Sequence, residues 1–422
     1  MMNILDILKE RGLLEDVTSP DLQKFVESPV TVYAGFDPSS DSLQAGNFVT
    51  IMVLAHFQRC GHKVIGLIGG ATGMIGDPSG KSAERNLLTE EQVQHNVVGI
   101  RENLSRFLDF NHPTAPAILV NNADWFKDFS FIGFLRDVGK HFRMGTMLGK
   151  ESVRKRLDSE AGMSYAEFSY QLLQAYDFLK LNEMHGCRLQ VGGSDQWGNI
   201  TAGTDLMRKI KGVEGYGAIT PLICDSAGQK FGKSEGNAVY LDAKKTSCYD
   251  FYQFFFRTAD ADVIRYLKVF TFISLEEIAA LDEQVRSAPG ARAAQKKLAE
   301  EVTRTVHGED GLKIAGRASA VLFGDSMEGL HAADLLSIFA NVPSKELPRP
   351  QVESAGVLDL AVAAGLCSSK GEARRLVESG GLYINNRRVE GLQYKVAAAD
   401  IIDGRLLVLR SGKKTFHLVK IG

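Results

Sequence analysis

Glycine, carboxylate and amide groups occur together in a segment whose spacing suits contact with a nucleotide. The segment GFDPSSDSLQAGN (35–47) follows an apolar run and leads into a helical pattern at Gly46 and Asn47. Glycine has no side chain, so a flat purine or a ribose would be able to approach the backbone at Gly46, and a helix N-terminus favours a nearby phosphate. An ordinary strand-to-helix turn would explain the same residues.

Two further segments carry groups suited to ribose and phosphate. In GGSDQWGN (192–199), Gly193 would face a ribose and Asp195 would accept hydrogen bonds from its hydroxyls. In KFGKS (230–234), Lys230 and Lys233 are three residues apart on a glycine-containing loop, and they would neutralise a triphosphate as pyrophosphate departs. An ordinary loop and a solvated lysine-rich loop are the alternatives.

Two familiar nucleotide motifs are excluded by spacing. A phosphate-binding P-loop needs glycine five residues before Gly-Lys-Ser, but Ile75 stands there for the GKS at 80–82 and Ala227 for the GKS at 232–234. The glycines of GLIGGATGMIGDPSGKS (66–82) also do not fit the dinucleotide pattern GxGxxG. The chain therefore belongs to neither of these two classes of nucleotide-binding protein.

The elements that must position these groups alternate between strands and helices. Short apolar runs predict strands at 30–36, 63–70, 117–122 and 189–193, with helical periodicity between them, as at 90–108. This alternation predicts an α/β fold with a parallel sheet covered on both faces. Ligands of such sheets bind at the carboxyl ends of the strands, where the glycine-rich segments lie.

The chain divides into regions of different pattern. We expect an α/β domain over 1–245, which includes KFGKS, then a helical domain over 246–345 and a Pro-containing polar linker over 346–353. Residues 354–422 combine two helical patterns with strand-like runs and predict a small α+β domain. In the second helical pattern, Ser368 or Ser369 suits an N-cap, and Gly380 or Gly381 suits a stop.

Composition indicates a soluble protein with local rather than overall positive charge. The 422 residues are 44% hydrophobic and carry a net charge of -2, but residues 351–422 hold 11 Lys and Arg against 7 Asp and Glu. RNA contact through charge is therefore expected in the C-terminal region. The five cysteines are scattered without a CxxC pair, which favours thiols and no zinc site. With no secretion signal or apolar span, we expect a cytoplasmic protein without membrane contact.

Several motifs, taken in order, resemble one enzyme family. YAGFDP, GGATGMIGDPSG, FSYQLLQAYDF, GGSDQWGNI and KFGKSEGNAV look like signatures of the class I aminoacyl-tRNA synthetases, specifically the bacterial tyrosyl type. The C-terminal region resembles an S4-type RNA-binding domain. The resemblance implies a Rossmann-type catalytic domain, a helical anticodon-arm domain over 246–345, and ATP, L-tyrosine and tRNA(Tyr) as substrates. It also implies a homodimer formed through 123–165, and Mg²⁺ that accompanies ATP without a protein ligand that we can name.

The resemblance assigns one group of residues to tyrosine. Tyr33 and Asp177 match the pair that holds the phenol hydroxyl, and an ordinary strand aromatic and helix carboxylate are the alternatives. The positions that match the α-ammonium site and the pocket around it are Asp77, Tyr170, Gln174, Thr72 and Gln196. Tyr170, Gln174 and Asp177 are spaced i, i+4 and i+7, so one helical face would present all three.

A second group of positions matches the family's ATP and RNA sites. Those that match the adenosine site are Asp37, Gly46, Gly193 and Asp195. Those that match the cations and hydroxyl approaching pyrophosphate are Lys81, Arg85, Lys230, Lys233 and Ser234. The basic residues expected to contact RNA are Arg374, Arg375, Arg387, Arg388, Lys413 and Lys414, with a role in surface solubility as the alternative.

The chain departs from the family at one motif. The family's His-x-Gly-His reads Gln44-Ala45-Gly46-Asn47 here, so both imidazoles are absent. Side-chain amides also donate hydrogen bonds, and our hypothesis is that Gln44 and Asn47 act as neutral substitutes in an active enzyme. The alternatives are a non-catalytic RNA-binding protein on a synthetase scaffold, a tryptophanyl enzyme and, more distantly, a generic nucleotidyltransferase.

Overall fold

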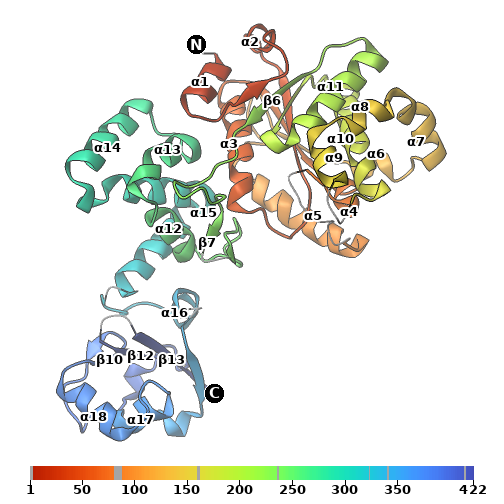
Figure 1. The fold of residues 1–422 in the computed structure, drawn as a ribbon. Coiled ribbons are helices and arrows are strands. Elements are labelled where there is room, and N and C mark those ends of the chain that lie inside the picture. Colours follow the sequence, from red (N-terminus) through yellow and green to blue (C-terminus); the bar gives the residue numbers. More distant parts are fainter. Residues whose placement is uncertain are drawn as a thin grey trace. The chain divides into compact units, whose positions relative to one another are not determined.

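The structure, a computed structural model, describes residues 3–79, 88–158, 162–234, 237–322, 324–339, 342–412 and 415–422. The chain forms two compact units, which we describe separately (Figure 1). The N-terminal unit comprises residues 1–246 and 254–306, and the C-terminal unit comprises residues 247–253 and 307–422. Within the described ranges, none of the helices has the length and apolar character needed to cross a membrane.

A six-stranded sheet forms the centre of the N-terminal unit. Its order is β1-β6-β5-β2-β3-β4, and every pair is parallel except the short edge pair β1–β6. The four predicted strands are present, and β1 and β6 were not predicted. The bounds are β1 Asp16–Val17, β2 Thr31–Phe36, β3 Lys63–Ile68, β4 Ile118–Asn121, β5 Leu189–Gly193 and β6 Tyr216–Thr220.

The strand order reverses between β2 and β5. From β2 the chain proceeds outward to β3 and β4, whereas β5 and β6 lie on the other side, and Tyr33 on β2 is paired with Gln190 on β5. At such a switch point the connections leave in opposite directions, and a crevice opens at the carboxyl ends of the two strands. The segments that begin at Gly35 and Gly193 therefore meet at one edge of the sheet.

Helices cover this sheet. Helix α3 packs on β2, β3 and β5, while α11 packs on β5 and β6 and also along α10 (Figure 1). Helix α10 begins with a capping box between Ser164 and Glu167 and ends at Gly186 in the left-handed conformation. The bounds are α1 Ile4–Glu10, α2 Leu22–Phe25, α3 Ala45–Arg59, α4 Thr72–Ile75, α5 Glu90–Leu104, α6 Ala123–Phe126, α7 Phe131–Asp137, α8 Met144–Leu148, α9 Glu151–Leu157, α10 Tyr165–His185 and α11 Trp197–Lys211.

The region after residue 232 contains a two-stranded ribbon and then helices, as its pattern predicts. Helix α15 is interrupted at Gly308, where a φ of 72° and a ψ of -179° depart from helical geometry. A positive φ of this kind favours glycine. The bounds are β7 Lys233–Ser234, β8 Asn237–Ala238, α12 Cys248–Phe256, α13 Asp260–Phe270, α14 Leu275–Ser287, α15 Ala293–Leu322 and α16 Ala332–Ile338.

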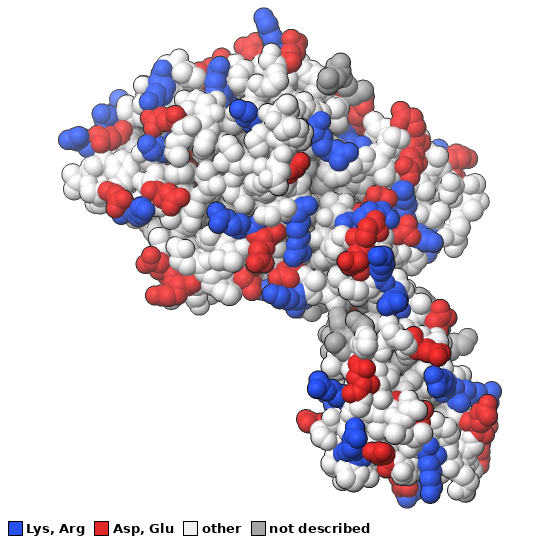
Figure 2. Space-filling model, turned by 180° about the vertical axis from the view of Figure 1, so that it is seen from behind, with Lys and Arg blue, Asp and Glu red and all other residues white. Residues whose placement is uncertain are grey.

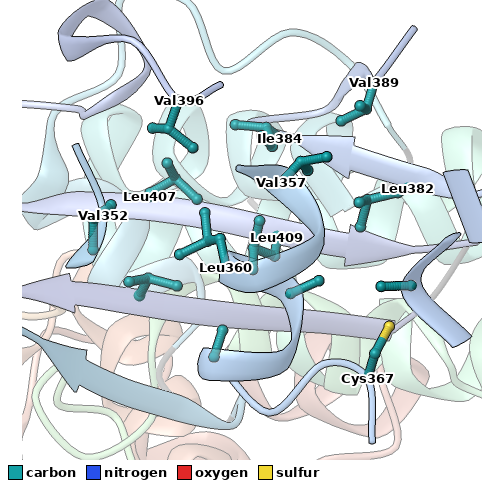
Figure 3. Packing of buried hydrophobic residues seen from close by; sticks show 14 of the residues in the cluster. Val352, Val357, Leu360, Cys367, Leu382, Ile384, Val389, Val396, Leu407 and Leu409 are labelled. Carbon is teal, nitrogen blue, oxygen red and sulfur yellow. The ribbon is translucent and has the colours of Figure 1, made fainter. Parts of the chain in front are cut away.

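A second sheet, with order β11-β10-β12-β13-β9, organises the C-terminal unit. Apolar residues of its strands and of α17 and α18, including Val357, Leu360, Leu407 and Leu409, form a buried core (Figure 3). Ser369 caps α18 and Gly380 follows its end with a φ of 68°. The bounds are β9 Ser344–Leu347, α17 Val357–Ala363, α18 Lys370–Glu378, β10 Leu382–Ile384, β11 Arg387–Arg388, β12 Leu406–Ser411 and β13 Thr415–Ile421.

Part of the segment interpreted as a linker is ordered within this second sheet. Strand β9 pairs in parallel with β13, so Glu346 and Leu347 belong to the sheet rather than to an irregular connection. Val352 is fully buried in the core. The two prolines, Pro348 and Pro350, favoured a linker, but they follow the strand and do not interrupt its hydrogen bonds.

Candidate active site

A cleft of about 510 Å³ opens at the strand-order reversal of the first sheet. Strands β2 and β5 form its floor, α10 and the first turn of α3 line it, and the segment 220–223 with Lys230 to Gly232 closes one side. Most of the residues expected from the sequence meet here: the lining residues include Tyr33, Asp37, Gln44, Gly46, Asn47, Thr72, Asp77, Tyr170, Gln174, Asp177, Gly193, Asp195, Gln196 and Lys230.

Helix α10 presents three of these side chains to the cleft. Tyr170, Gln174 and Asp177 all line it, as their i, i+4 and i+7 spacing predicts. Tyr170 and Asp177 are also buried, at 5% and 1% exposure. The shared face of one helix therefore supplies a hydroxyl, an amide and a carboxylate to the same space.

Asp37 connects the end of β2 to this helix. The Tyr170 hydroxyl donates to Asp37 Oδ2 over 2.7 Å, and the Thr72 hydroxyl donates to Asp37 Oδ1 over 2.7 Å. Burial raises the pKa of Tyr170 well above its usual value, and the negative charge of Asp37 adds to the effect. Tyr170 is therefore a neutral hydroxyl that donates to a carboxylate.

A second carboxylate, Asp77, lies among amide side chains. Gln196 Nε2 donates to Asp77 Oδ2 over 2.6 Å, and Gln174 Nε2 donates to Gln196 Oε1 over 3.3 Å. Asn199 Nδ2 lies within 3.1 Å of Gln174 Oε1 and 3.2 Å of Gln196 Oε1. Asp77 therefore accepts from the amide N–H₂ group of Gln196, and its negative charge attracts a cationic group that carries several N–H donors.

Asp177 and Tyr33 form the buried end of the cleft. Trp125 Nε1 donates to Asp177 Oδ1 over 2.9 Å, and Asn122 Nδ2 donates to Oδ2 over 3.1 Å. Burial raises the pKa of Asp177 well above its usual value, while these two donors oppose the shift. The buried Tyr33 hydroxyl has no hydrogen-bond partner within the described part of the chain. A polar group of a ligand would satisfy both Tyr33 and Asp177 here.

The opposite part of the cleft carries Asp195 and Lys230. Burial and then the negative charge of Asp77 raise the pKa of Asp195, whereas Lys230 opposes that shift. Lys230 is exposed at the cleft wall. Lys233 and Ser234 lie on β7, but their side chains are outside the description, and Lys81 and Arg85 are outside the described residues altogether.

At the start of α3, the side-chain amide of Asn47 already takes part in a hydrogen bond. Asn47 Oδ1 accepts a hydrogen bond of 3.1 Å from the Gln44 backbone N–H, which caps the helix. This contact occupies the amide oxygen and leaves the amide N–H₂ as the remaining group of Asn47, beside the cleft. The two ends of this amide therefore differ: the oxygen caps the helix, and the N–H₂ group lies beside the cleft.

Comparison with known proteins agrees with this arrangement over the whole chain. A family model described as tRNA synthetases class I (W and Y) matches residues 25–324, and one described as tyrosine–tRNA ligase SYY-like C-terminal domain matches residues 334–419. The chain belongs to this family of class I tRNA synthetases.

Relatives of similar length are found in bacteria. The chain is 51% identical over 422 residues to a tyrosine–tRNA ligase of Protochlamydia amoebophila, which covers 100% of this chain and 99% of that protein. It is 52% identical over 426 residues to a tyrosine–tRNA ligase of Opitutus terrae, with 100% of both covered. A C-terminally truncated mitochondrial tyrosyl-tRNA synthetase of Aspergillus nidulans is 33% identical with a TM-score of 0.69, covering 76% of this chain and 95% of that one.

The structure of this class I synthetase also reveals site residues that sequence reasoning missed. Asn122 and Trp125 hold Asp177, Asn199 joins the amides around Asp77, and Ser79 donates its backbone N–H to Asp77 Oδ1 over 2.9 Å. Asn122 is the last residue of the predicted strand 117–122, so the rule that ligands meet strand ends would have pointed to it. Asn199 is the last residue of the GGSDQWGN segment, which the sequence already singled out, whereas Trp125 carries no comparable signal.

The basic residues expected to contact RNA lie on the surface of the C-terminal unit. Arg374 and Arg375 are exposed on α18, and Arg387 and Arg388 are exposed on β11. Lys413 and Lys414 are outside the described residues. Basic and acidic side chains are interspersed on the face drawn in Figure 2, so charge on that face does not gather in one large basic patch.

Proposed function

We propose that this chain is a tyrosine–tRNA ligase that activates L-tyrosine with ATP and then esterifies tRNA. In the first step a tyrosine carboxylate oxygen attacks the α-phosphorus of ATP, the α–β phosphoanhydride bond breaks, and pyrophosphate leaves. In the second step a ribose hydroxyl of the terminal adenosine of tRNA attacks the tyrosyl carbonyl, and AMP leaves. The observation that carries the proposal is the buried pair Tyr33 and Asp177, which end a cleft of the right polarity.

The phenol end of tyrosine would meet this pair. A phenol donates its proton to the Asp177 carboxylate and accepts a hydrogen bond from the Tyr33 hydroxyl, which is otherwise unsatisfied. Phenylalanine would leave the buried Tyr33 hydroxyl without a partner and would give Asp177 no donor beyond Asn122 and Trp125, and tyrosyl enzymes as a class reject it by about 10⁵ for such unmet hydrogen bonds. A phenol-specific end is also the reason to prefer tyrosine over tryptophan as substrate.

The ammonium end of tyrosine would lie near Asp77, Tyr170 and Gln174. Asp77 supplies negative charge, and Gln174 and Gln196 supply amide oxygens, since hydrogen bonds already orient them. Thr72 supports the same wall through its bond to Asp37. Gln174 and Asp177 lie at successive positions along the same face of α10, and this spacing would separate the ammonium end of the substrate from its phenol end.

ATP would occupy the side of the cleft between α3 and the KFGKS loop. Gly46, Gly193, Asp37 and Asp195 would contact adenosine, and a Cβ at Gly46 would meet only the Phe231 carbonyl at 3.8 Å, so protein packing alone does not require glycine there. The groups assigned to the phosphates are Gln44, Asn47, Lys81, Arg85, Lys230, Lys233 and Ser234. Their role is positioning and charge stabilisation, because the carboxylate of the substrate is the nucleophile.

Magnesium would enter with ATP and neutralise phosphate charge. In the ranges that the structure describes, no cluster of three or more His, Cys, Asp or Glu side chains could hold a metal ion. We propose that Mg²⁺ accompanies ATP and name no protein ligand for it, and each step above uses groups of the chain and its substrates.

The remaining parts of the chain would serve tRNA and assembly. Arg374, Arg375, Arg387 and Arg388 are exposed where an RNA backbone could reach them, and Lys413 and Lys414 complete the proposed set. The proposed homodimer would bury apolar side chains of 123–165, of which Phe131, Ile132, Met144 and Tyr165 are 59–71% exposed. We retain the division into a catalytic domain (1–245), a helical anticodon-arm domain (246–345) and an S4-like domain (354–422), and a cytoplasmic location.

ATP–pyrophosphate exchange on the purified protein tests the proposal. Tyrosine, phenylalanine and tryptophan are supplied separately, and exchange should occur with tyrosine alone. Exchange with tryptophan would identify the sister specificity. Absence of exchange with all three, together with retained tRNA binding, would favour an RNA-binding protein on a synthetase scaffold.

A further inference from the structure

A short hairpin leads into the KFGKS loop. We call this hairpin the stalk and define it as residues 223–231, so its last two residues are the first two of KFGKS. Its two sides are joined by a hydrogen bond of 2.9 Å from Phe231 N to the Ile223 carbonyl and one of 2.8 Å from Asp225 N to the Gln229 carbonyl. The Asp225 side chain also accepts from the backbone N–H groups of Ala227 and Gln229. Lys230, at the end of the stalk, lines the cleft, so any shift of the stalk moves a proposed catalytic lysine.

Helix α13 holds the stalk through two polar contacts. Arg265 Nη2 donates to the Cys224 carbonyl, and Asp262 Oδ2 accepts a hydrogen bond of 2.9 Å from Ser226 N. Arg265 and Asp262 also form an ion pair of 2.8 Å with each other. The Asp262 side chain is 5% exposed, whereas that of Arg265 is 46% exposed. Arg265 therefore lies at the surface but bonds to the backbone of the stalk.

An aromatic stack connects the same helix to both sides of the ATP site. Phe231 of KFGKS lies on Phe270 of α13 with ring centroids 4.5 Å apart and an interplanar angle of 23°. Phe270 in turn stacks on Phe48, at 5.5 Å and 23°. Phe48 directly follows Asn47, so the Phe270 ring of α13 packs on one aromatic ring of α3 and on one of the KFGKS loop.

The returning end of the loop is tied to α3 as well. Val239 N donates to the Gly232 carbonyl and Ala45 N donates to the Val239 carbonyl, over 2.9 Å and 2.8 Å. Gly232 has a φ of 99°, and a Cβ there would lie 3.0 Å from Gly46 N. The loop is thus anchored on α3 at one end, while its stalk depends on α13 at the other.

We propose that α13 is a positioning element for the KFGKS loop, with Arg265 as the residue that holds the stalk in register. Within the described residues, α13 contributes nothing to the lining of the cleft, so it acts through Cys224, Ser226 and Phe231 rather than on substrate. The inference rests on the proposed function, in which Lys230 and Lys233 stabilise the departing pyrophosphate. Small displacements of such groups lower rates strongly, because catalysis by position tolerates little misplacement.

Substitution of Arg265 tests the inference in the full-length protein. Arg265→Ala should lower kcat of tyrosine-dependent pyrophosphate exchange by about tenfold or more and leave the equilibrium Kd for tyrosine within about twofold. Arg265→Lys keeps a cationic donor and should recover most of the rate. Arg286→Ala is the matched control, since Arg286 is a surface arginine on α14 with 69% side-chain exposure, and within the described part of the chain it forms an ion pair with Asp282 alone.

A second readout does not depend on activity. Trypsin cleavage after Lys230 and Lys233, followed by mass spectrometry, should be about tenfold faster in Arg265→Ala and unchanged in Arg265→Lys and Arg286→Ala, because a released stalk opens more often. Equal rates of exchange and of cleavage in Arg265→Ala and wild type would overturn the inference, and so would a loss that Arg265→Lys does not repair. Absence of exchange in the wild type with the expected cleavage pattern would overturn the proposed function and leave the positioning role of α13 standing.

Discussion

The Tyr170 hydroxyl donates a hydrogen bond of 2.7 Å to Asp37 Oδ2, although 133 residues separate the two in the chain. The resemblance of the chain to the family assigned Asp37 to the ATP site and Tyr170 to the tyrosine site, yet a hydrogen bond joins the two side chains directly. Thr72 bonds the other oxygen of the same carboxylate. The proposed sites for the two substrates therefore share these side chains, as a reaction between tyrosine and ATP would require.

Loss of one phenol partner should reduce selectivity for tyrosine. Tyr33→Phe removes the only described hydroxyl that lacks a partner beside Asp177, so the penalty for binding phenylalanine should fall. We expect the ratio of kcat/KM for tyrosine over phenylalanine in pyrophosphate exchange to drop by at least about tenfold. An unchanged ratio would contradict the assignment of Tyr33 to the phenol.

The pH dependence of tyrosine binding should follow Asp177. Burial raises the pKa of Asp177, and Trp125 lowers it by donating to Oδ1. The ionised form accepts the phenol proton, so tyrosine affinity should be complete above this pKa and fall as pH decreases through it. Trp125→Phe removes the donor and should move the fall in affinity to higher pH, measured as Kd against pH by calorimetry. A shift to lower pH would show that Trp125 does not stabilise the carboxylate.

The two ends of the Asn47 amide should be separable by substitution. Asn47→Asp keeps an oxygen that accepts from the Gln44 N–H and so retains the helix cap, but it loses the N–H₂ donor. Adenylate formation should slow by at least about tenfold, with tyrosine Kd and melting temperature nearly unchanged. Asn47→Ala should slow the reaction similarly and also lose about 1 kcal/mol of stability with the cap.

Gln44 offers an independent test of the same hypothesis. Gln44→Ala should slow adenylate formation in single-turnover assays without weakening tyrosine binding, because Gln44 lines the ATP side of the cleft. If tyrosine binding weakened while the rate of chemistry stayed normal, the proposed role in charge stabilisation would be wrong.

Stability at acid pH should depend on His56. Burial, and then the positive charges of Arg11 and Arg59, lower the pKa of His56 to about 3. The unfolded chain binds the proton near pH 6.5 and the folded chain does not, so this group favours folding fully above pH 6.5 and loses its contribution as pH falls toward 3. Between pH 7 and pH 5, the free energy of unfolding of His56→Gln should therefore fall by about 2 kcal/mol less than that of the wild type. Parallel pH profiles from urea unfolding at one protein concentration would refute the burial of a neutral imidazole.

The C-terminal arginines should affect the tRNA step alone. Arg374→Ala combined with Arg375→Ala removes two exposed charges from α18 without touching the core, whereas a truncation near residue 350 would cut into the unit that contains β9. Aminoacylation should fall and the salt dependence of tRNA binding should become shallower, while pyrophosphate exchange stays at the wild-type rate. Equal loss of both activities would indicate a structural rather than an RNA-binding role.

The sequence by itself determined which side chains are present for the chemistry and most of the strands and helices that carry them. Four of the six strands of the first sheet, the shared face of Tyr170, Gln174 and Asp177, and the cap at Ser369 follow from local periodicity and residue type, so they were predictable. Strand β6 was missed because three of the residues near it are glycine or alanine, and β9 because the prolines after it suggested a linker.

Only the tertiary structure decided how the polar groups are paired. The bonds from Asn122 and Trp125 to Asp177, the amide contacts of Asn199, and the link between Arg265 and the stalk join segments far apart in the chain. No local pattern encodes such contacts, since they depend on which strand ends the sheet order brings together and on how α10 and α13 pack. Motifs and residue types therefore predicted a site for tyrosine and ATP, and the packing of distant segments determined which polar groups each carboxylate contacts.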